Sequence, residues 1–166
     1  MRIKKVKKNV FKYTTEHMEL CLVNPHSGAF PFTRYMVLPR ARWGIPRIYH
    51  ECDLLALSKQ NVLHEIEIKI SKGDLLADKR KRHSHQSDII HRLWFAVPET
   101  MVEFAATHIP THAGLISCYA NKSTIIRRPK YKKSEKPDEE IVKHMYDLLQ
   151  MRYWSEKIRF HNRKNK

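Results

Sequence analysis

Two short apolar runs joined by a polar link constrain the fold of this chain more than any other feature. Residues 51–58 and 62–70 both have the composition of β-strands, and residues 59–61 have that of a tight turn. In the second run charged residues alternate with isoleucines, so the two kinds fall on opposite faces: Glu65, Glu67 and Lys69 against Ile66, Ile68 and Ile70. We predict an antiparallel hairpin with one apolar face and one ionisable face, to which the first run adds Asp53.

The remaining helix and strand patterns predict a mixed α/β (α+β) fold, a mixed sheet flanked by helices. We expect a helix over 15–23, a strand over 35–38 ended by Pro39, and a helix over 74–83 that crosses to a parallel strand over 92–97. A helix over 99–107, a hairpin of 114–119 with 123–126, and a final helix capped by Asp138 follow. The apolar stripe of that last helix extends to Trp154. We expect the chain to consist of a basic arm (1–10), a single domain (11–158) and a basic tail (159–166).

Net charge indicates the class of partner. The chain has 32 Lys and Arg against 17 Asp and Glu, a formal charge of +15, which favours a polyanion such as nucleic acid over a basic protein without such a partner. No apolar run has the length of a membrane span, which excludes a membrane partner at this stage. The residues expected to contact nucleic acid lie in basic loops and runs: Arg40, Arg42, Arg47, Lys72, Lys79, Arg82, Lys130 and Lys132.

The cysteine pattern bears on compartment and metal type. Cys21, Cys52 and Cys118 lie far apart and form no paired framework, which is typical of a reducing cytoplasm. No Cys or His pair has the spacing of a zinc finger, although the chain has 11 histidines. A structural zinc site is therefore not expected.

The acidic face of the hairpin carries residues suited to phosphodiester chemistry. Carboxylates from two neighbouring strands, Asp53 and Glu67, can hold one Mg²⁺, and the backbone carbonyl of Ile68 can add a ligand. Lys69 lies two residues after Glu67 and points the same way. It can orient or deprotonate an attacking water, or stabilise charge that develops on phosphorus.

These residues resemble the PD-(D/E)XK nuclease superfamily, and the wider stretch resembles its MmcB-like branch, linked to DNA repair. The resemblance covers about residues 50–120 and rests on Glu51-Cys-Asp-Leu-Leu, Glu65-Ile-Glu-Ile-Lys-Ile-Ser71, Asp74-Leu, Asp78 with Lys79, and Trp94-Phe-Ala-Val-Pro98. The family's proline before the first acid is absent, because Cys52 precedes Asp53.

The resemblance implies a restriction-endonuclease-like core and a metal-dependent deoxyribonuclease with Mg²⁺, or Mn²⁺ as a substitute. It implies catalytic roles for Asp53, Glu67 and Lys69, with Glu19 of the first helix as an additional acid. The corresponding process is DNA repair, or restriction or mobile-element defence.

Each of these interpretations has an alternative in which the residues have only an ordinary structural role. The hairpin can be a surface element with cross-strand Glu–Lys pairs, and Glu19 can be an ordinary solvated glutamate. The second candidate function is that of a non-catalytic nucleic-acid-binding protein on a degenerate nuclease fold. The third is that of a small basic RNA-associated factor. The complete set of Asp53, Glu67 and Lys69 favours the nuclease. The sequence leaves open whether the DNA is single- or double-stranded and whether the protein forms a homodimer.

Overall fold

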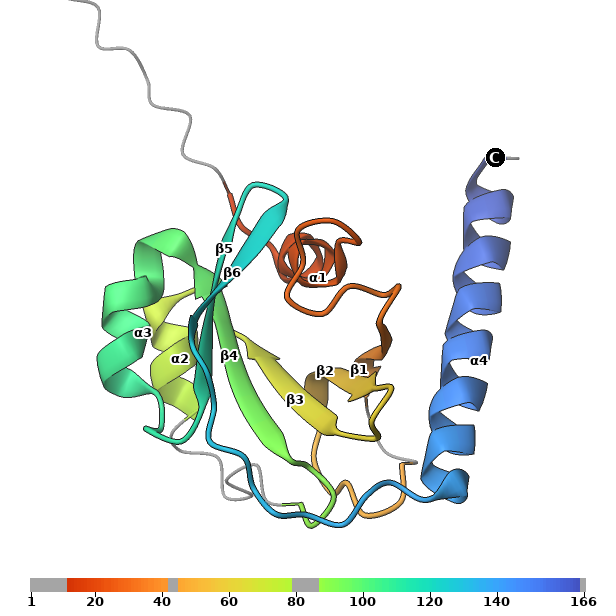
Figure 1. Cartoon of the computed structure of the whole chain (residues 1–166). Coiled ribbons are helices and arrows are strands. Elements are labelled where there is room, and N and C mark those ends of the chain that lie inside the picture. The colour runs from red at the N-terminus through yellow and green to blue at the C-terminus, as the bar shows by residue number, and fades with distance from the viewer. Residues whose placement is uncertain (1–11, 42–44, 79–86, 165–166) are drawn as a thin grey trace, which may run out of the picture.

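A six-stranded mixed sheet is the centre of the computed structural model, which describes residues 12–41, 45–78 and 87–164 (Figure 1). The sheet order follows the chain: β1 (Tyr35–Ala41), β2 (Cys52–Ser58), β3 (Leu63–Ile68), β4 (Arg92–Pro98), β5 (Gly114–Tyr119) and β6 (Lys122–Arg127). Strands β1 to β3 are antiparallel, β3 to β5 are parallel, and β6 is antiparallel to β5. The predicted mixed α/β fold with a helix-flanked sheet is confirmed.

The hairpin and the crossover that follows it form as predicted. Leu54 pairs with Ile66, and Leu57 pairs with Leu63. Helix α2 (Lys72–Asp78) then connects β3 to the parallel strand β4. The Ser71 hydroxyl accepts a hydrogen bond from the Asp74 N–H at 3.1 Å, which satisfies a backbone donor in the first turn of this helix. The expected extension of the helix to residue 83 lies outside the described residues.

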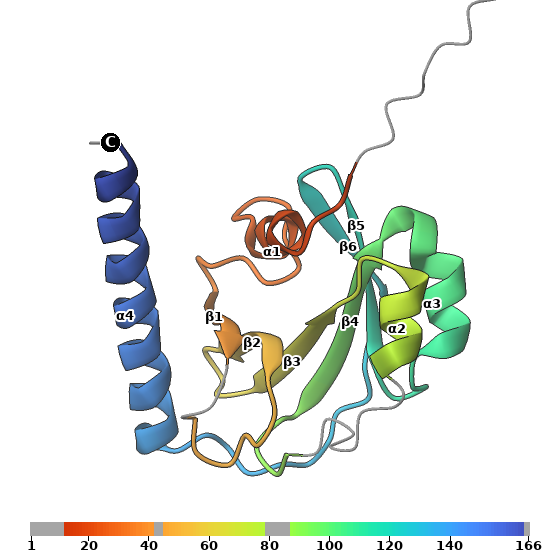
Figure 2. The same cartoon turned by 180° about the vertical axis from the view of Figure 1, so that it is seen from behind.

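Helices cover both faces of the sheet (Figures 1 and 2). Helix α1 (Thr15–Val23) packs on one face, where it meets apolar residues from four strands: Leu54, Ala56, Ile66, Ile68, Trp94, Ala96, Ile116 and Cys118. A 3₁₀ turn η1 (Glu99–Met101), helix α3 (Val102–His108) and α2 cover the other face around Phe95, Val97 and Leu115. The isoleucine face is confirmed for the two isoleucines within β3, whereas Ile70 lies beyond the strand and is exposed.

Two element boundaries differ most from the sequence prediction. Strand β1 continues through Pro39 to Ala41. Proline is tolerated there because β1 is the edge strand and pairs only with β2, so no second neighbour needs its missing N–H. Helix α4 (Glu139–Lys164) is 26 residues long and includes residues 159–164, which we expected to form a separate tail. Its start is as predicted, since the Asp138 carboxylate accepts from the Ile141 N–H at 2.9 Å.

An aromatic cluster joins α1 and its following loop to the centre of the sheet. The rings of Phe30 and Trp94 meet edge to face at 5.5 Å, and the Trp94 indole N–H donates to Nδ1 of His64 at 3.0 Å. Burial, together with the nearby charges of Arg92 and His91, lowers the pKa of His64 to about 3. His64 is therefore the neutral acceptor that the indole requires, and this hydrogen bond ties β3 to β4.

The three cysteines are free and buried, as their scattered positions suggested. Of the helices in the described parts of the chain, none combines the length and the apolar character that crossing a membrane requires.

Candidate active site

A buried ion pair lies where β3 leaves the sheet. The Lys69 ammonium is 2.7 Å from Oε2 of Glu67, and the two residues are only 3% and 1% exposed. The backbone holds Lys69 in place, because its N–H donates to the Ala96 carbonyl of β4 at 3.0 Å. A charge buried without a partner is costly. In the structure the two charges meet each other, which compensates both.

Asp53 lies near the start of β2, next to Leu54, which pairs with Ile66 of β3. Leu54 packs on the α1 side of the sheet, and Leu55 packs on the opposite side. Strict alternation would put Cys52 with Leu54, yet it packs in the same cluster as Leu55. The predicted alternation therefore ends at Asp53. Arg40, which lies between the paired positions of β1 on either side of Asp53, has a positive φ of 46°.

The Asp53 carboxylate lies against the backbone of β3. Its Oδ2 accepts a hydrogen bond at 2.8 Å from the N–H of Ile68, the residue between Glu67 and Lys69. The structure thus places Asp53 against the backbone between Glu67 and Lys69, at one end of the hairpin. Ile68 joins them through its N–H, and its carbonyl as a metal ligand stays a prediction.

Glu19 of α1 belongs to the same region. Its Oε1 is 3.7 Å from Nε of Arg40, and its side chain is only 16% exposed. Burial raises the pKa of the Glu19 carboxyl; Arg40 lowers it, and the Asp53 carboxylate raises it again. Glu19 is therefore a partly buried acid within electrostatic reach of Asp53. This position differs from the solvated glutamate that we kept as the alternative.

A second polar cluster lies beside the first and was missed in the sequence. His50, Cys52 and Glu65 are buried, and one ligand atom from each lies within 4.8 Å of the others, so they could hold a metal ion. Nε2 of His50 is 2.8 Å from Oε1 of Glu65. Burial raises the pKa of the Cys52 thiol, as do the carboxylates of Glu65, Glu67 and Asp53. No spacing rule would find this set, because the turn of the hairpin separates its members.

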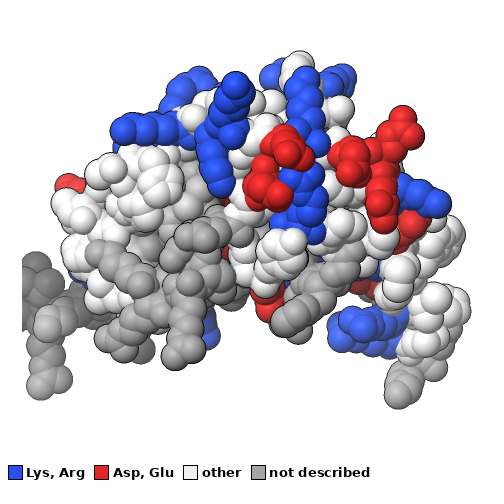
Figure 3. All heavy atoms as spheres, turned by 90° about the horizontal axis from the view of Figure 1, so that it is seen from below, with Lys and Arg blue, Asp and Glu red and all other residues white. Residues whose placement is uncertain are grey.

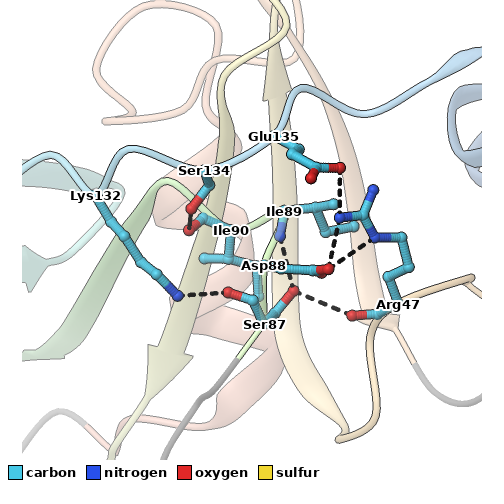
Figure 4. A network of polar contacts seen from close by, with 8 residues as sticks. All are labelled: Arg47, Ser87, Asp88, Ile89, Ile90, Lys132, Ser134 and Glu135. Carbon is cyan, nitrogen blue, oxygen red and sulfur yellow. Dashed lines mark hydrogen bonds and ion pairs between the residues drawn. The ribbon is translucent and has the colours of Figure 1, made fainter.

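Two of the residues expected to contact nucleic acid are engaged in a structural network instead (Figure 4). Arg47 contacts the carboxylates of Asp88 and Glu135, at 2.5 Å and 2.7 Å from its Nη2. The Lys132 ammonium donates to the Ser87 carbonyl at 2.6 Å. These contacts hold together three loops that are far apart in the sequence. The expectation that Arg47 and Lys132 serve phosphate binding is therefore unsupported, because their charged groups already have protein partners.

The other residues expected to contact phosphate differ in their exposure and in their neighbours. Arg40 is exposed beside Glu19, Lys130 is exposed, and the Lys72 ammonium lies 4.9 Å from the centre of the Phe104 ring. Arg42, Lys79 and Arg82 lie outside the described residues. In the middle of the face seen in Figure 3, Lys and Arg side chains stand between acidic ones. That part of the surface does not form one continuous basic patch.

Comparison with known proteins bears on the fold. No protein-family model and no curated protein matches the chain. One solved structure is similar. It is the SPO1766 protein of unknown function from Silicibacter pomeroyi, with a TM-score of 0.58 and 20% identity over 76% of this chain and 82% of that one. At this identity the similarity concerns the fold alone, so any function has to be argued from the residues of the site.

Proposed function

We propose that this protein is a metal-dependent DNA endonuclease of the PD-(D/E)XK type with a restriction-endonuclease-like core. The observation that carries the proposal is the convergence of Asp53, Glu67 and Lys69 at the end of one hairpin. The strand–turn–strand–helix–strand context that the motif requires surrounds them. The proposed setting is the cytoplasm, in DNA repair or in restriction or mobile-element defence.

The donor set fits a hard divalent cation. Asp53, Glu67 and Glu19 offer carboxylate oxygens, the ligands that Mg²⁺ and Mn²⁺ prefer, and Asp53 and Glu19 are only partly buried. When bound there, the ion would activate water and polarise a phosphodiester oxygen. The neighbouring His50–Cys52–Glu65 set has imidazole and thiol donors, so it suits a softer ion than Mg²⁺.

The protein's own groups have distinct parts in this reaction. The Ile68 N–H orients the Asp53 carboxylate, and the Lys69 ammonium fixes the rotamer of Glu67. In the proposed reaction Lys69 also stabilises the negative charge that develops on phosphorus, which lowers the barrier. Glu19, whose pKa is raised, can hold a proton or add an acidic ligand beside Asp53.

One observation favours the second function, a nucleic-acid-binding protein on a degenerate nuclease fold. The Glu67–Lys69 pair is closed and almost inaccessible, as in a purely structural ion pair. A binding protein would keep the pair for folding and would have no metal-dependent chemistry. The two functions therefore differ in what divalent ions do to the protein.

Cleavage by the purified full chain tests the proposal. Supercoiled plasmid and a labelled single-stranded oligonucleotide are incubated with Mg²⁺, with Mn²⁺, or with EDTA. We expect cleavage of at least one substrate with either ion and none with EDTA, because the carboxylates need the ion to act on a phosphodiester. Intact substrates under all three conditions, at protein concentrations that bind them, would favour the binding protein instead.

A further inference from the structure

The C-terminal half of α4 exposes large apolar side chains that a folded domain normally covers. From residue 151 onward, five of them are at least 55% exposed: Met151, Tyr153, Trp154, Ile158 and Phe160. The N-terminal half of the same helix is anchored against the sheet by Ile141 and Met145. In Figure 1 the rest of the helix stands at the β1 side of the molecule with its end free. The sequence suggested that Trp154 belongs to the packed stripe, and the structure contradicts this.

The exposed aromatic rings are interleaved with cations. The Lys157 ammonium lies 5.4 Å from the centre of the Tyr153 ring and 5.3 Å from that of Trp154. The Lys164 ammonium lies 4.5 Å from the centre of the Phe160 ring. Rings and charges therefore share one surface. We call it the α4 face, and it comprises Tyr153, Trp154, Lys157, Arg159, Phe160, Arg163 and Lys164.

The helix does not offer the continuous apolar seam that pairing with a second copy requires. Tyr146, Tyr153 and Phe160 recur every seven residues, as one seam position of a coiled coil would. The other seam position, three residues after each aromatic, has Leu149 in the first repeat but Glu156 and Arg163 in the next two. An apolar partner helix would bury these charges at a cost. Because the face has four cations, Lys157, Arg159, Arg163 and Lys164, against the single acid Glu156, a polyanion fits it better.

A groove lies between α4 and α1. It has a volume of about 640 Å³, and its lining includes the acids Glu16 and Glu156, the rings of Tyr153 and Phe160, and the cations Lys157 and Arg159. Arg152, one residue before the start of the face, donates to the Arg40 carbonyl, and the Arg40 side chain pairs with Glu19. Arg40 therefore links the start of the α4 face to Glu19, one of the acids that we assign to catalysis.

We infer that the α4 face binds single-stranded nucleic acid. Bases stack on the exposed rings of Tyr153, Trp154 and Phe160, and phosphates pair with the lysines and arginines between them. Stacking needs unpaired bases, which an intact duplex does not offer, and it tolerates any base sequence. The inference rests on the proposed function in one respect, since it makes single-stranded DNA the substrate that reaches Asp53 and Glu67.

Binding to the full chain in EDTA tests this without any cleavage. Fluorescence anisotropy of a labelled single-stranded oligonucleotide is measured for the parent, Trp154→Leu, Phe160→Leu, and the matched control Tyr119→Leu, which alters an exposed ring at the end of β5. Leucine keeps helix propensity and removes the ring. We expect each α4 variant to bind about 5- to 100-fold more weakly, and the control to bind within about twofold of the parent.

The charges are tested by salt dependence. The double variant Lys157→Gln/Lys164→Gln should reduce the slope of log affinity against log salt by about 1.4, since each phosphate contact on a single strand contributes about 0.7. Unchanged affinity in the leucine variants, or no single-strand binding by the parent, overturns the inference. So does a parent dimer that Trp154→Leu dissociates, because the face would then be a contact between copies.

The outcomes separate this inference from the proposed nuclease activity. Binding that depends on the α4 face, in a parent that cleaves nothing with Mg²⁺ or Mn²⁺, would overturn the nuclease and keep the inference. Metal-dependent cleavage that Trp154→Leu and Phe160→Leu leave unchanged, together with unchanged binding, would keep the nuclease and overturn the inference.

Discussion

Replacing Asp53 with asparagine is expected to abolish metal-dependent cleavage and to leave DNA binding within about twofold of the parent. Asparagine keeps the shape of the side chain, and its amide oxygen can still accept the Ile68 N–H, but the charge that attracts the cation is lost. The loss of rate should exceed the roughly 10- to 100-fold that removing an outer partner of a metal ligand costs. Cleavage and anisotropy measured on the same preparations give the two numbers.

Asp147→Asn in α4 is a matched control, because it removes an exposed carboxylate at a position away from the proposed ligands. Its cleavage rate should equal that of the parent. Activity that persists in Asp53→Asn would show that the cleavage comes from another site or another protein.

The two charges of the Glu67–Lys69 pair are expected to be strongly coupled, and a double-mutant cycle measures this coupling. Lys69→Met leaves the Glu67 carboxylate buried without its ammonium partner, which should lower the free energy of unfolding by about 3–5 kcal/mol. Glu67→Gln should have a similar effect through the unpaired lysine. The double variant should lose less than the sum of the two, because each change removes the charge that the other left unpaired.

Urea unfolding of the parent, the two single variants and the double variant provides the coupling energy. A coupling below about 0.5 kcal/mol, the size of an ordinary exposed pair, would contradict the buried geometry. The result also affects how kinetics are interpreted. A Lys69 variant should be assayed well below its melting temperature, so that lost charge stabilisation is separated from lost fold.

Most of the fold was predictable because its signals are local. Alternation in 62–70, the Ser71 and Asp138 caps and the proline after residues 92–97 each act within a few residues. The same locality explains the misjudged end of β1. A proline normally ends a strand, and only the position of β1 at the sheet edge, which depends on the tertiary fold, makes Pro39 acceptable.

The candidate site was predicted in its residues but not in its geometry. Asp53, Glu67 and Lys69 could be named from strand spacing, yet the contact of Asp53 with the Ile68 N–H depends on how β2 and β3 lie against each other. The partners of Arg47 and Lys132 were hidden for a similar reason. They come from residues about 40 or more positions away, which no local pattern connects.

The part of α4 that packs against the sheet is shorter than the sequence predicted. An apolar stripe indicates which face of a helix packs, but it cannot indicate how far along the helix the rest of the protein extends. Ile141 and Met145 meet the sheet, whereas Tyr153 and Trp154 on the continuation of the stripe are exposed. That difference between pattern and structure is what points to the α4 face as a binding surface.

Anomalous diffraction from crystals of the full chain soaked in Mn²⁺ tests the central claim most directly. The account predicts one manganese peak in contact with the carboxylates of Asp53 and Glu67, at about the 2.0–2.3 Å typical of hard divalent cations and oxygen ligands. Asp53→Asn crystals soaked in the same way should lose the peak. A peak at His50, Cys52 and Glu65 instead, or no peak at Asp53 and Glu67 in crystals whose site is open to solvent, would contradict the assignment of a metal-dependent nuclease centre.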